Sequence, residues 1–324
     1  MGESEQSRVE LSRRELGGTG LSVTEVCIGT SPIANIAGLY GYEVGEERAI
    51  ETVLAAFDSP FNFIDTSNGY GPNGESEVRI GKAIARRGGM PEDYVLATKV
   101  DPDPVTRAYT GDRVRRSVEE SLERLGMDRF QLLQLHDPEQ ISFDEGTAPG
   151  GPLEALVALK EEGLVDHIGV AGGPVGLLQQ YLDTGVFDVV LSHNRLTLLD
   201  RSAEALFTSA RERGLGVMNA APYGGGMLAK GPEAQPKYAY GARDDRITEA
   251  AIAMRDACTR YGVPLAAAAL QFSTSHPLVD STVVGVSAPE RIQQTLDYLA
   301  VEIPDELWAE LADLAPSQEL WLDS

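Results

Sequence analysis

Short apolar segments alternate with amphipathic segments eight times along this chain, and this alternation limits the possible folds more than any other feature. The apolar segments predict strands at 26–29, 61–65, 94–99, 130–136, 164–170, 187–191, 215–219 and 281–284. Each is followed by apolar residues at helical spacing, which predict helices at 46–58, 75–87, 112–125, 153–162, 175–183, 202–213, 247–261 with 265–272, and 289–299. A regular alternation of strands and helices is typical of a parallel sheet.

Eight such units in 324 residues favour a closed (β/α)8 barrel, the TIM barrel of the α/β class, over an open sheet. The competing fold, a doubly wound dinucleotide-binding domain, would place a G-x-G-x-x-G motif directly after its first strand, and none follows residues 26–29. Two short segments around a Gly-rich turn at 9–24 predict an N-terminal β-hairpin. We expect residues 1–8 to be a disordered tail and residues 9–324 to form a single domain.

The segments between these elements indicate where the chain turns and where helices begin. Residues 30–45 and 137–150 lack periodicity and 221–245 is rich in glycine, so we expect loops there. Asp112 is the predicted N-cap of its helix, because an aspartate side chain accepts hydrogen bonds from the free amide groups of a first turn. A last helix is expected at 304–314, before a polar tail.

The charge balance and the ends of the chain exclude some classes of partner. The chain has 27 basic and 50 acidic residues, and its net charge of −23 argues against nucleic acid, whose binding needs a basic field. The N-terminus has no apolar signal region, and no apolar run approaches the ~18 residues of a membrane helix. We therefore expect a cytoplasmic protein without membrane association, in which Cys27 and Cys258 are reduced core residues.

Four polar residues of complementary chemistry fall at or just past the ends of three consecutive predicted strands. Asp65 ends the second strand, and Tyr70 follows it within a Gly-rich turn. Lys99 ends the third strand and His136 ends the fourth. Each residue alone is more simply explained as a capping, packed or solvated group. Because the active site of such a barrel lies at the C-terminal ends of its strands, the four together predict a shared site.

These four side chains predict proton transfer at the tyrosine. A Lys99 ammonium held by the Asp65 carboxylate and placed beside the Tyr70 phenol would lower the pKa of that phenol from ~10. A tyrosine of this kind exchanges a proton near neutral pH, and His136 is expected to hydrogen-bond the substrate oxygen and orient the substrate. None of the four donates a hydride, so we expect a redox cofactor.

The chain resembles the aldo-keto reductases over essentially its whole length. The matching motifs are Phe63-Ile-Asp-Thr-Ser-Asn-Gly-Tyr70-Gly, Ala97-Thr-Lys99, Leu132-Leu-Gln-Leu-His136-Asp-Pro, Ile168-Gly-Val, Leu198-Leu-Asp-Arg201 and Gly285-Val-Ser-Ala-Pro-Glu-Arg291. The resemblance implies that Tyr70 donates or accepts the proton, that Lys99 and Asp65 tune it, and that His136 orients the substrate. It also implies that NADP or NAD binds in an extended form without a Rossmann fold.

Two later segments resemble the aldose 1-dehydrogenase branch of that family, which includes L-fucose, D-threo-aldose and L-galactose dehydrogenases. These segments run from Asp188 to Ser202 and from Asn219 to Gly231. The resemblance implies oxidation of an aldose, such as L-fucose, L-galactose or D-arabinose, at C1 to its lactone. Tyr40 lies in the loop after the first strand, and this position makes it a candidate substrate contact together with His136.

The cofactor-binding candidates follow from the same resemblance. They are His193, Asn194, Tyr223, Gly224, Gly225, Gly226, Ser287 and Arg291. The three glycines stand where the family cradles the pyrophosphate, and backbone amides without side chains let phosphates approach closely. Ser287 and Arg291 open the last barrel helix, whose N-terminus suits an anion.

Several positions depart from the family pattern. The usual Ser-Asn pair after the fifth strand is replaced within Gly169-Val-Ala-Gly-Gly-Pro, so His193 or Asn194 would have to hold the nicotinamide amide. Ala220 stands where an aromatic ring often stacks on the nicotinamide, Gly285 where NADP-preferring relatives often carry lysine, and Thr295 where asparagine often contacts the adenine. The smaller number of cations favours NAD or the use of both cofactors.

Three other functions stay open on the sequence alone. The first is a general NADPH-dependent reductase of aldehydes and ketones. The second is a barrel lyase or aldolase in which Lys99 forms a Schiff base, although a neighbouring carboxylate and phenol favour an ammonium. The third is a cofactor-binding subunit without turnover. No metal site is expected, because the four histidines at 136, 167, 193 and 276 lack metal-ligand spacing.

Overall fold

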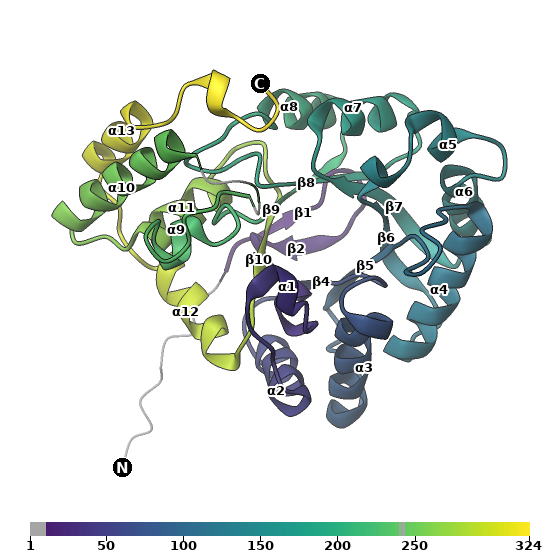
Figure 1. Ribbon diagram of the computed structural model, residues 1–324. Coiled ribbons are helices and arrows are strands. Elements are labelled where there is room, and N and C mark those ends of the chain that lie inside the picture. The colour runs from purple at the N-terminus through teal and green to yellow at the C-terminus, as the bar shows by residue number, and fades with distance from the viewer. Residues whose placement is uncertain (1–10, 240, 242–243) are drawn as a thin grey trace, which may run out of the picture.

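The computed structural model describes residues 11–239, 241 and 244–324, and the tail expected at 1–8 lies outside them. Eight parallel strands close into a barrel in the order β10-β3-β4-β5-β6-β7-β8-β9, which confirms the predicted (β/α)8 fold (Figure 1). The strands are β3 (Val26–Gly29), β4 (Phe63–Asp65), β5 (Val95–Val100), β6 (Phe130–His136), β7 (Val165–Gly172), β8 (Val189–His193), β9 (Gly216–Ala220) and β10 (Ser281–Gly285).

The helices that follow the strands pack around the outside of the barrel (Figure 1). They are α2 (Glu46–Phe57), α3 (Glu75–Arg87), α4 (Gly111–Leu125), α6 (Pro152–Glu161), α7 (Val175–Asp183), α8 (Glu204–Glu212), α10 (Asp245–Arg260), α11 (Leu265–Thr274), α12 (Pro289–Leu299) and α13 (Asp305–Asp313). None of the described helices is long and apolar enough to cross a membrane.

The segments expected to be loops contain short helices as well. These are η1 (Ser31–Ile33), α1 (Ala37–Tyr40), η3 (Pro138–Gln140), α5 (Phe143–Thr147) and α9 (Met227–Lys230), together with η2 (Pro72–Gly74) and η4 (Gln318–Leu320) elsewhere. All are five residues or fewer, too short for the periodicity of apolar residues to reveal them.

The N-terminal hairpin is formed by β1 (Arg13–Glu15) and β2 (Ser22–Thr24), which pair antiparallel. Leu16 and Val23 of this hairpin are fully buried among the side chains that fill the barrel interior. The turn approaches the barrel closely, since a Cβ at Gly17, where φ is +55°, would overlap the backbone of Gly216. The hairpin therefore packs against the N-terminal ends of the strands and leaves the opposite ends for function.

Two details of the predicted elements are wrong. The N-cap of α4 is Thr110, whose side chain accepts a hydrogen bond from the amide of Arg113, so Asp112 lies inside the first turn. β4 begins at Phe63 rather than at 61, because the Asn62 amide group accepts from Thr24 N at 2.8 Å and donates to the carbonyl of Ser22. Both differences arise from side-chain hydrogen bonds that the pattern of apolar residues does not encode.

The register of the strands brings the predicted site residues to one end of the barrel. Asp65 pairs with Gly29 on one side and with Ala97 on the other. Lys99 lies two residues beyond Ala97 and pairs with Gln134, and His136 lies two residues beyond Gln134. Because side chains in a strand alternate with a period of two, these steps keep the functional side chains on the same face of the sheet.

Candidate active site

Asp65, Lys99 and Tyr70 meet at the C-terminal end of the barrel, as their positions in the sequence predicted. Lys99 Nζ forms an ion pair with Asp65 Oδ1 and donates hydrogen bonds to the carbonyl of Thr66 at 2.7 Å and to the Tyr70 hydroxyl at 3.2 Å. The side chains of Lys99 and Asp65 are only 2% and 3% exposed. A buried ammonium with three acceptors is firmly held, so the lysine has a fixed position beside the phenol.

Further contacts hold this cluster in place. Gln134 on β6 donates from Nε2 to Asp65 Oδ2 at 3.1 Å, so both carboxylate oxygens are hydrogen-bonded. The turn that carries Tyr70 continues into Gly71, where φ is +82° and a Cβ would overlap the carbonyl of Ala34. A glycine is required there, and the loop between β4 and α3 brings Tyr70 back over the strand ends.

The expected lowering of the Tyr70 pKa is contradicted by the structure. Burial raises the pKa of Tyr70 well above its ordinary value, and the neighbouring Asp65, Asp137 and Asp101 raise it further. The Lys99 ammonium, which is paired with Asp65, does not outweigh these effects. Tyr70 is therefore a neutral phenol that can donate a proton.

His136 lies next to Tyr70, with their ring centroids 5.4 Å apart. Its Nδ1 is 2.7 Å from Asp101 Oδ1, a contact that the sequence analysis missed. Asp101 also accepts hydrogen bonds from the Ser67 hydroxyl and, at 2.7 Å, from the amide of Gly69. One signal could have revealed it: Asp101 lies two residues beyond Lys99, at the spacing that keeps side chains on one face.

The protonation of His136 and Asp101 follows from this contact. Burial alone would raise the pKa of Asp101, but His136 and the hydrogen bonds from Ser67 and Gly69 outweigh burial and lower it. Burial alone would lower the pKa of His136, but the carboxylates of Asp137 and Asp101 outweigh it and raise this pKa to about 9. The ionised Asp101 can only accept, so His136 Nδ1 carries a hydrogen, and Nε2 is left to donate to a substrate.

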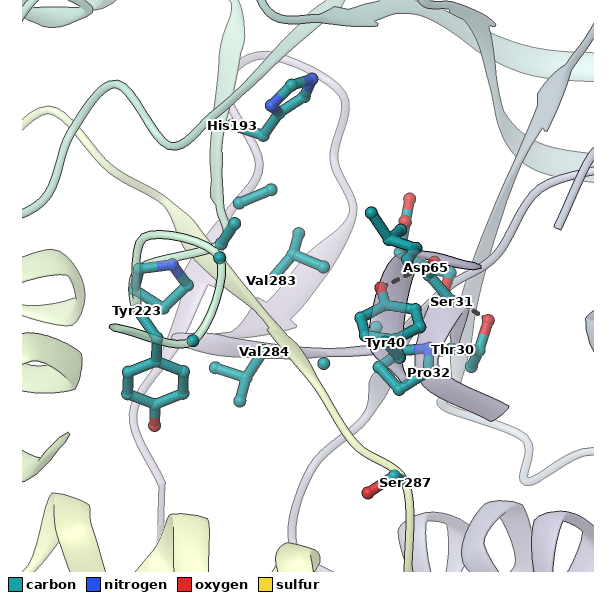
Figure 2. A pocket seen from close by; sticks show the side chains of 18 of the residues that line it. Thr30, Ser31, Pro32, Tyr40, Asp65, His193, Tyr223, Val283, Val284 and Ser287 are labelled. Atoms are coloured by element: carbon teal, nitrogen blue, oxygen red, sulfur yellow. Dashed lines mark hydrogen bonds between the residues drawn. The ribbon is translucent and has the colours of Figure 1, made fainter. Parts of the chain in front are cut away.

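A pocket of about 730 Å³ surrounds these groups and extends over the ends of β8, β9 and β10 (Figure 2). Most of the predicted residues line it, namely Tyr40, Asp65, Tyr70, Lys99, His136, His193, Asn194, Tyr223, Gly225, Gly226, Ser287 and Arg291. Tyr40 is the last residue of α1, and its hydroxyl donates to Ser31 Oγ on η1 at 2.9 Å. Three residues that differ from the family pattern also line the pocket, namely Ala220, Gly285 and Thr295.

Gly224 differs from its two neighbours. It is not one of the residues that line the pocket, and a Cβ there would overlap the ring of Tyr238. Gly224, Gly225 and Gly226 all have positive φ, at +57°, +69° and +99°. Gly224 therefore permits close packing behind the turn, while Gly225 and Gly226 present backbone to the pocket.

Two observations fit a nicotinamide dinucleotide in this pocket. The Asn194 side chain is buried, and its Oδ1 has no hydrogen-bond partner among the described residues, so an acceptor is left for a ligand amide. Ser287 and Arg291 also line a second cavity of about 460 Å³, which lies between the N-terminal ends of α2 and α12. Helix N-termini and an arginine suit a phosphate group.

Asp137, Glu139 and His193 bring one potential metal-ligand atom each to within 4.8 Å of one another. Their wide spacing concealed this group in the sequence, which predicted no metal site. Glu139 is exposed, and exposed acidic groups gather often without an ion. The cluster therefore carries no metal assignment.

Comparison with known proteins identifies relatives for this arrangement. Residues 25–316 match the model of the aldo/keto reductase family. The chain is 32% identical over 306 residues to D-threo-aldose 1-dehydrogenase of a Pseudomonas species, a match that covers 86% of this chain and 91% of the relative. It is 32% identical over 295 residues to L-galactose dehydrogenase of Arabidopsis thaliana, covering 90% and 88% of the two chains.

Solved structures show the same fold. The holo form of an aldo-keto reductase from Bacillus halodurans superposes with a TM-score of 0.77 at 23% sequence identity. The match covers 94% of this chain and 97% of that one. At this identity the likeness supports the barrel architecture alone.

Proposed function

The chain belongs to the aldo/keto reductase family and is an NAD(P)-dependent oxidoreductase, and from that premise we propose that it oxidises an aldose at C1 to its lactone. Candidate substrates are L-fucose, L-galactose and D-arabinose. The observation that carries the proposal is the buried Asp65–Lys99–Tyr70 cluster at the base of a large pocket, in a chain whose relatives include aldose dehydrogenases.

Each residue of the cluster has a separate role in the proposed reaction. His136 Nε2 donates a hydrogen bond to the oxygen on C1 and holds it beside the Tyr70 hydroxyl. Tyr70, as phenolate, accepts the proton of the anomeric hydroxyl, and Lys99 stabilises the phenolate through its 3.2 Å contact. A bound nicotinamide supplies the hydride acceptor. In carbonyl reduction the same Tyr70 hydroxyl donates the proton.

The raised pKa of Tyr70 bears on the direction of the reaction. Proton donation, as in reduction, uses the phenol in its prevailing form, whereas oxidation needs the phenolate. We therefore propose that aldose oxidation is slow at low pH and accelerates as the pH rises.

Cofactor binding is proposed at the residues that line the far part of the pocket. Asn194 Oδ1 would accept a hydrogen bond from the nicotinamide amide. The backbone of Gly225 and Gly226 would face the phosphates. Arg291 and Ser287 would bind the adenosine end. Because Gly285 and Thr295 add no cation there, we propose NAD or the use of both cofactors. The cytoplasmic location remains a prediction.

Two alternatives have distinct expectations. A Schiff base at Lys99 would require a neutral amine with a free lone pair, whereas Lys99 Nζ is engaged with Asp65, Thr66 and Tyr70. Borohydride trapping with substrate is therefore expected to give no adduct. A general aldehyde reductase would use the same proton donor and differs only in substrate.

A panel of substrates followed by nicotinamide absorbance tests the proposal. L-fucose, L-galactose and D-arabinose are each offered with NAD and with NADP, and aromatic aldehydes are offered with NADPH. Reduction of either cofactor by at least one aldose is expected. If all three sugars fail while aromatic aldehydes oxidise NADPH, aldose oxidation is wrong and a general aldehyde reductase takes its place.

A further inference from the structure

Asp137 has an unusual backbone conformation directly beside the catalytic histidine. It follows the last residue of β6, and its φ of 42° and ψ of 59° are left-handed. The next residue is Pro138, and a residue before proline normally prefers extended backbone, so this conformation is strained. The surrounding structure holds it, because the Asp137 amide donates to the carbonyl of Ala171 at 2.7 Å and its carbonyl accepts from Gln140 at 3.0 Å.

The conformation places the Asp137 carboxylate at the wall of the pocket. Oδ2 lies 3.8 Å from His136 Nε2, the nitrogen left to bind substrate. Oδ1 is buried and finds no hydrogen-bond donor within the described ranges 11–239, 241 and 244–324. His193 Nε2 lies nearest to it at 3.7 Å, beyond hydrogen-bond reach, and its ring stands at the edge of the same pocket (Figure 2).

The charge of the Asp137 carboxylate determines how it can bind a ligand. Burial would raise the pKa of Asp137, but the neighbouring His136, His193 and Lys99 outweigh burial and lower it, so the group is ionised at neutral pH. An ionised carboxylate only accepts hydrogen bonds. Oδ2, on the side of His136 Nε2, is therefore an acceptor for a ligand hydroxyl, whereas the buried Oδ1 faces His193.

We propose that Asp137 determines substrate specificity by accepting a hydrogen bond from the hydroxyl on the carbon next to the reacting one. The inference rests on the proposed function, in which the oxygen on C1 lies between Tyr70 and His136. Because Asp137 Oδ2 lies beside His136 Nε2, the next oxygen along the substrate is the one within its reach. The substrate class is therefore an aldose or another 2-hydroxyaldehyde, rather than a simple aldehyde.

A carboxylate is an effective selector for such substrates. A site that is built to hydrogen-bond a substrate hydroxyl rejects the analogue that lacks it, because the protein group is then left buried and unpaired. The strained backbone fits this role, since strain of this kind persists at positions that serve a ligand. The His193 imidazole lies on the other side of the same carboxylate, with Nε2 3.7 Å from Asp137 Oδ1.

Two pairs of substrates that differ by one hydroxyl test the assignment. In oxidation the pair is D-arabinose and 2-deoxy-D-ribose, and in reduction it is lactaldehyde and propanal. The readout is the ratio of kcat/KM within each pair, because a general effect on His136 or on folding changes both members alike. Asp137→Asn is the informative variant, since asparagine tolerates the left-handed backbone and replaces the charged acceptor with a neutral amide of similar size.

We expect the wild-type protein to prefer the hydroxylated member of each pair, and Asp137→Asn to reduce that preference by roughly 10- to 100-fold. Asp144→Asn is the matched control, because it removes an exposed carboxylate on α5 that does not line the pocket, and it should leave the ratios unchanged. Equal losses for both members in Asp137→Asn, or no wild-type preference in either pair, would overturn the assignment.

The reductive pair separates this inference from the proposed function. A wild-type protein that oxidises no aldose, yet prefers lactaldehyde over propanal and loses that preference in Asp137→Asn, would overturn aldose oxidation and uphold the role of Asp137. A wild-type protein that oxidises D-arabinose, with ratios unaffected in Asp137→Asn, would uphold aldose oxidation and overturn the role of Asp137.

Discussion

His136 donates its Nδ1 hydrogen to Asp101 Oδ1 over 2.7 Å, and this bond leaves His136 Nε2 to face the pocket. Asp101 is itself held by the Ser67 hydroxyl and the amide of Gly69. Asp101 is tightly packed, since a Cβ at Gly69 would lie 2.6 Å from its carboxyl carbon. The carboxylate therefore both orients the imidazole and favours its charged form.

Replacement of Asp101 by asparagine should lower the pKa of His136. With a pKa of about 9, His136 is an imidazolium below that pH, and carbonyl reduction should decline as the pH rises through it. Because one carboxylate partner is lost, the pH at which the rate declines should fall by roughly one to three units. The pH dependence of kcat/KM and an NMR titration of the His136 ring measure the shift.

The control for this variant is Asp103→Asn in the same loop. Asp103 is partly buried, and its side chain accepts hydrogen bonds from the neighbouring Val105, at 3.0 Å, and Thr106, at 2.7 Å. Asp103→Asn should leave the pH at which carbonyl reduction declines unchanged. If the decline in Asp101→Asn occurs at the same pH as in the wild type, Asp101 does not act through His136.

His136 also makes the stability of the protein depend on pH. Its pKa in the folded protein, about 9, lies above the ~6.5 of an unfolded chain. Its protonation therefore stabilises the fold fully below pH ~6.5, and this contribution is lost as the pH rises through about 9. Urea unfolding across this range should show the loss, and Asp101→Asn should reduce it.

Replacement of Tyr70 by phenylalanine should lower kcat in both directions by roughly 10²- to 10⁴-fold. In the wild type, aldose oxidation should rise about tenfold per pH unit near neutrality, because burial keeps the phenol protonated there. Steady-state rates from pH ~6 to ~8 test both points. Tyr261→Phe, at a side chain that is 41% exposed, is the control, and retained activity in Tyr70→Phe would refute the proton-transfer role.

Replacement of Lys99 by methionine should destabilise the fold by about 3–5 kcal/mol, because it leaves the buried Asp65 carboxylate without its counter-charge. Lys82→Met breaks an ion pair with Glu46 of similar length whose side chains are about half exposed, and it should cost at most about 1 kcal/mol. Urea denaturation compares the two. Equal losses would show that burial of the Lys99 pair is unimportant.

Replacement of Gly224 by alanine should weaken cofactor binding. Its Cβ would overlap the Tyr238 ring, so the turn must move and carry Gly225 and Gly226 with it. We expect the Kd for NAD or NADP to rise roughly tenfold or more. Gly231→Ala shares the positive φ, at +88°, but has only Glu233 Oε2 nearby at 3.6 Å. Titration calorimetry should show a smaller change for this control.

The alternation of segments determined the architecture from the sequence alone. Apolar periodicity is a local property, so eight strands and their helices can be located without knowledge of their contacts. Asp65, Lys99 and His136 each stand at or next to a strand end, and parallel strands in a barrel bring those ends together. The sequence therefore identified both the fold and the cluster of side chains at the C-terminal ends of its strands.

Only the tertiary structure decided how those side chains behave. The pKa of Tyr70 rises rather than falls, because burial and the neighbouring carboxylates outweigh the Lys99 ammonium, which is paired with Asp65. Asp101 and Asp137 gain their roles from distances to His136 that depend on loop conformation. Burial, charge and hydrogen bonding depend on neighbours distant in the chain, and a linear pattern does not contain those neighbours.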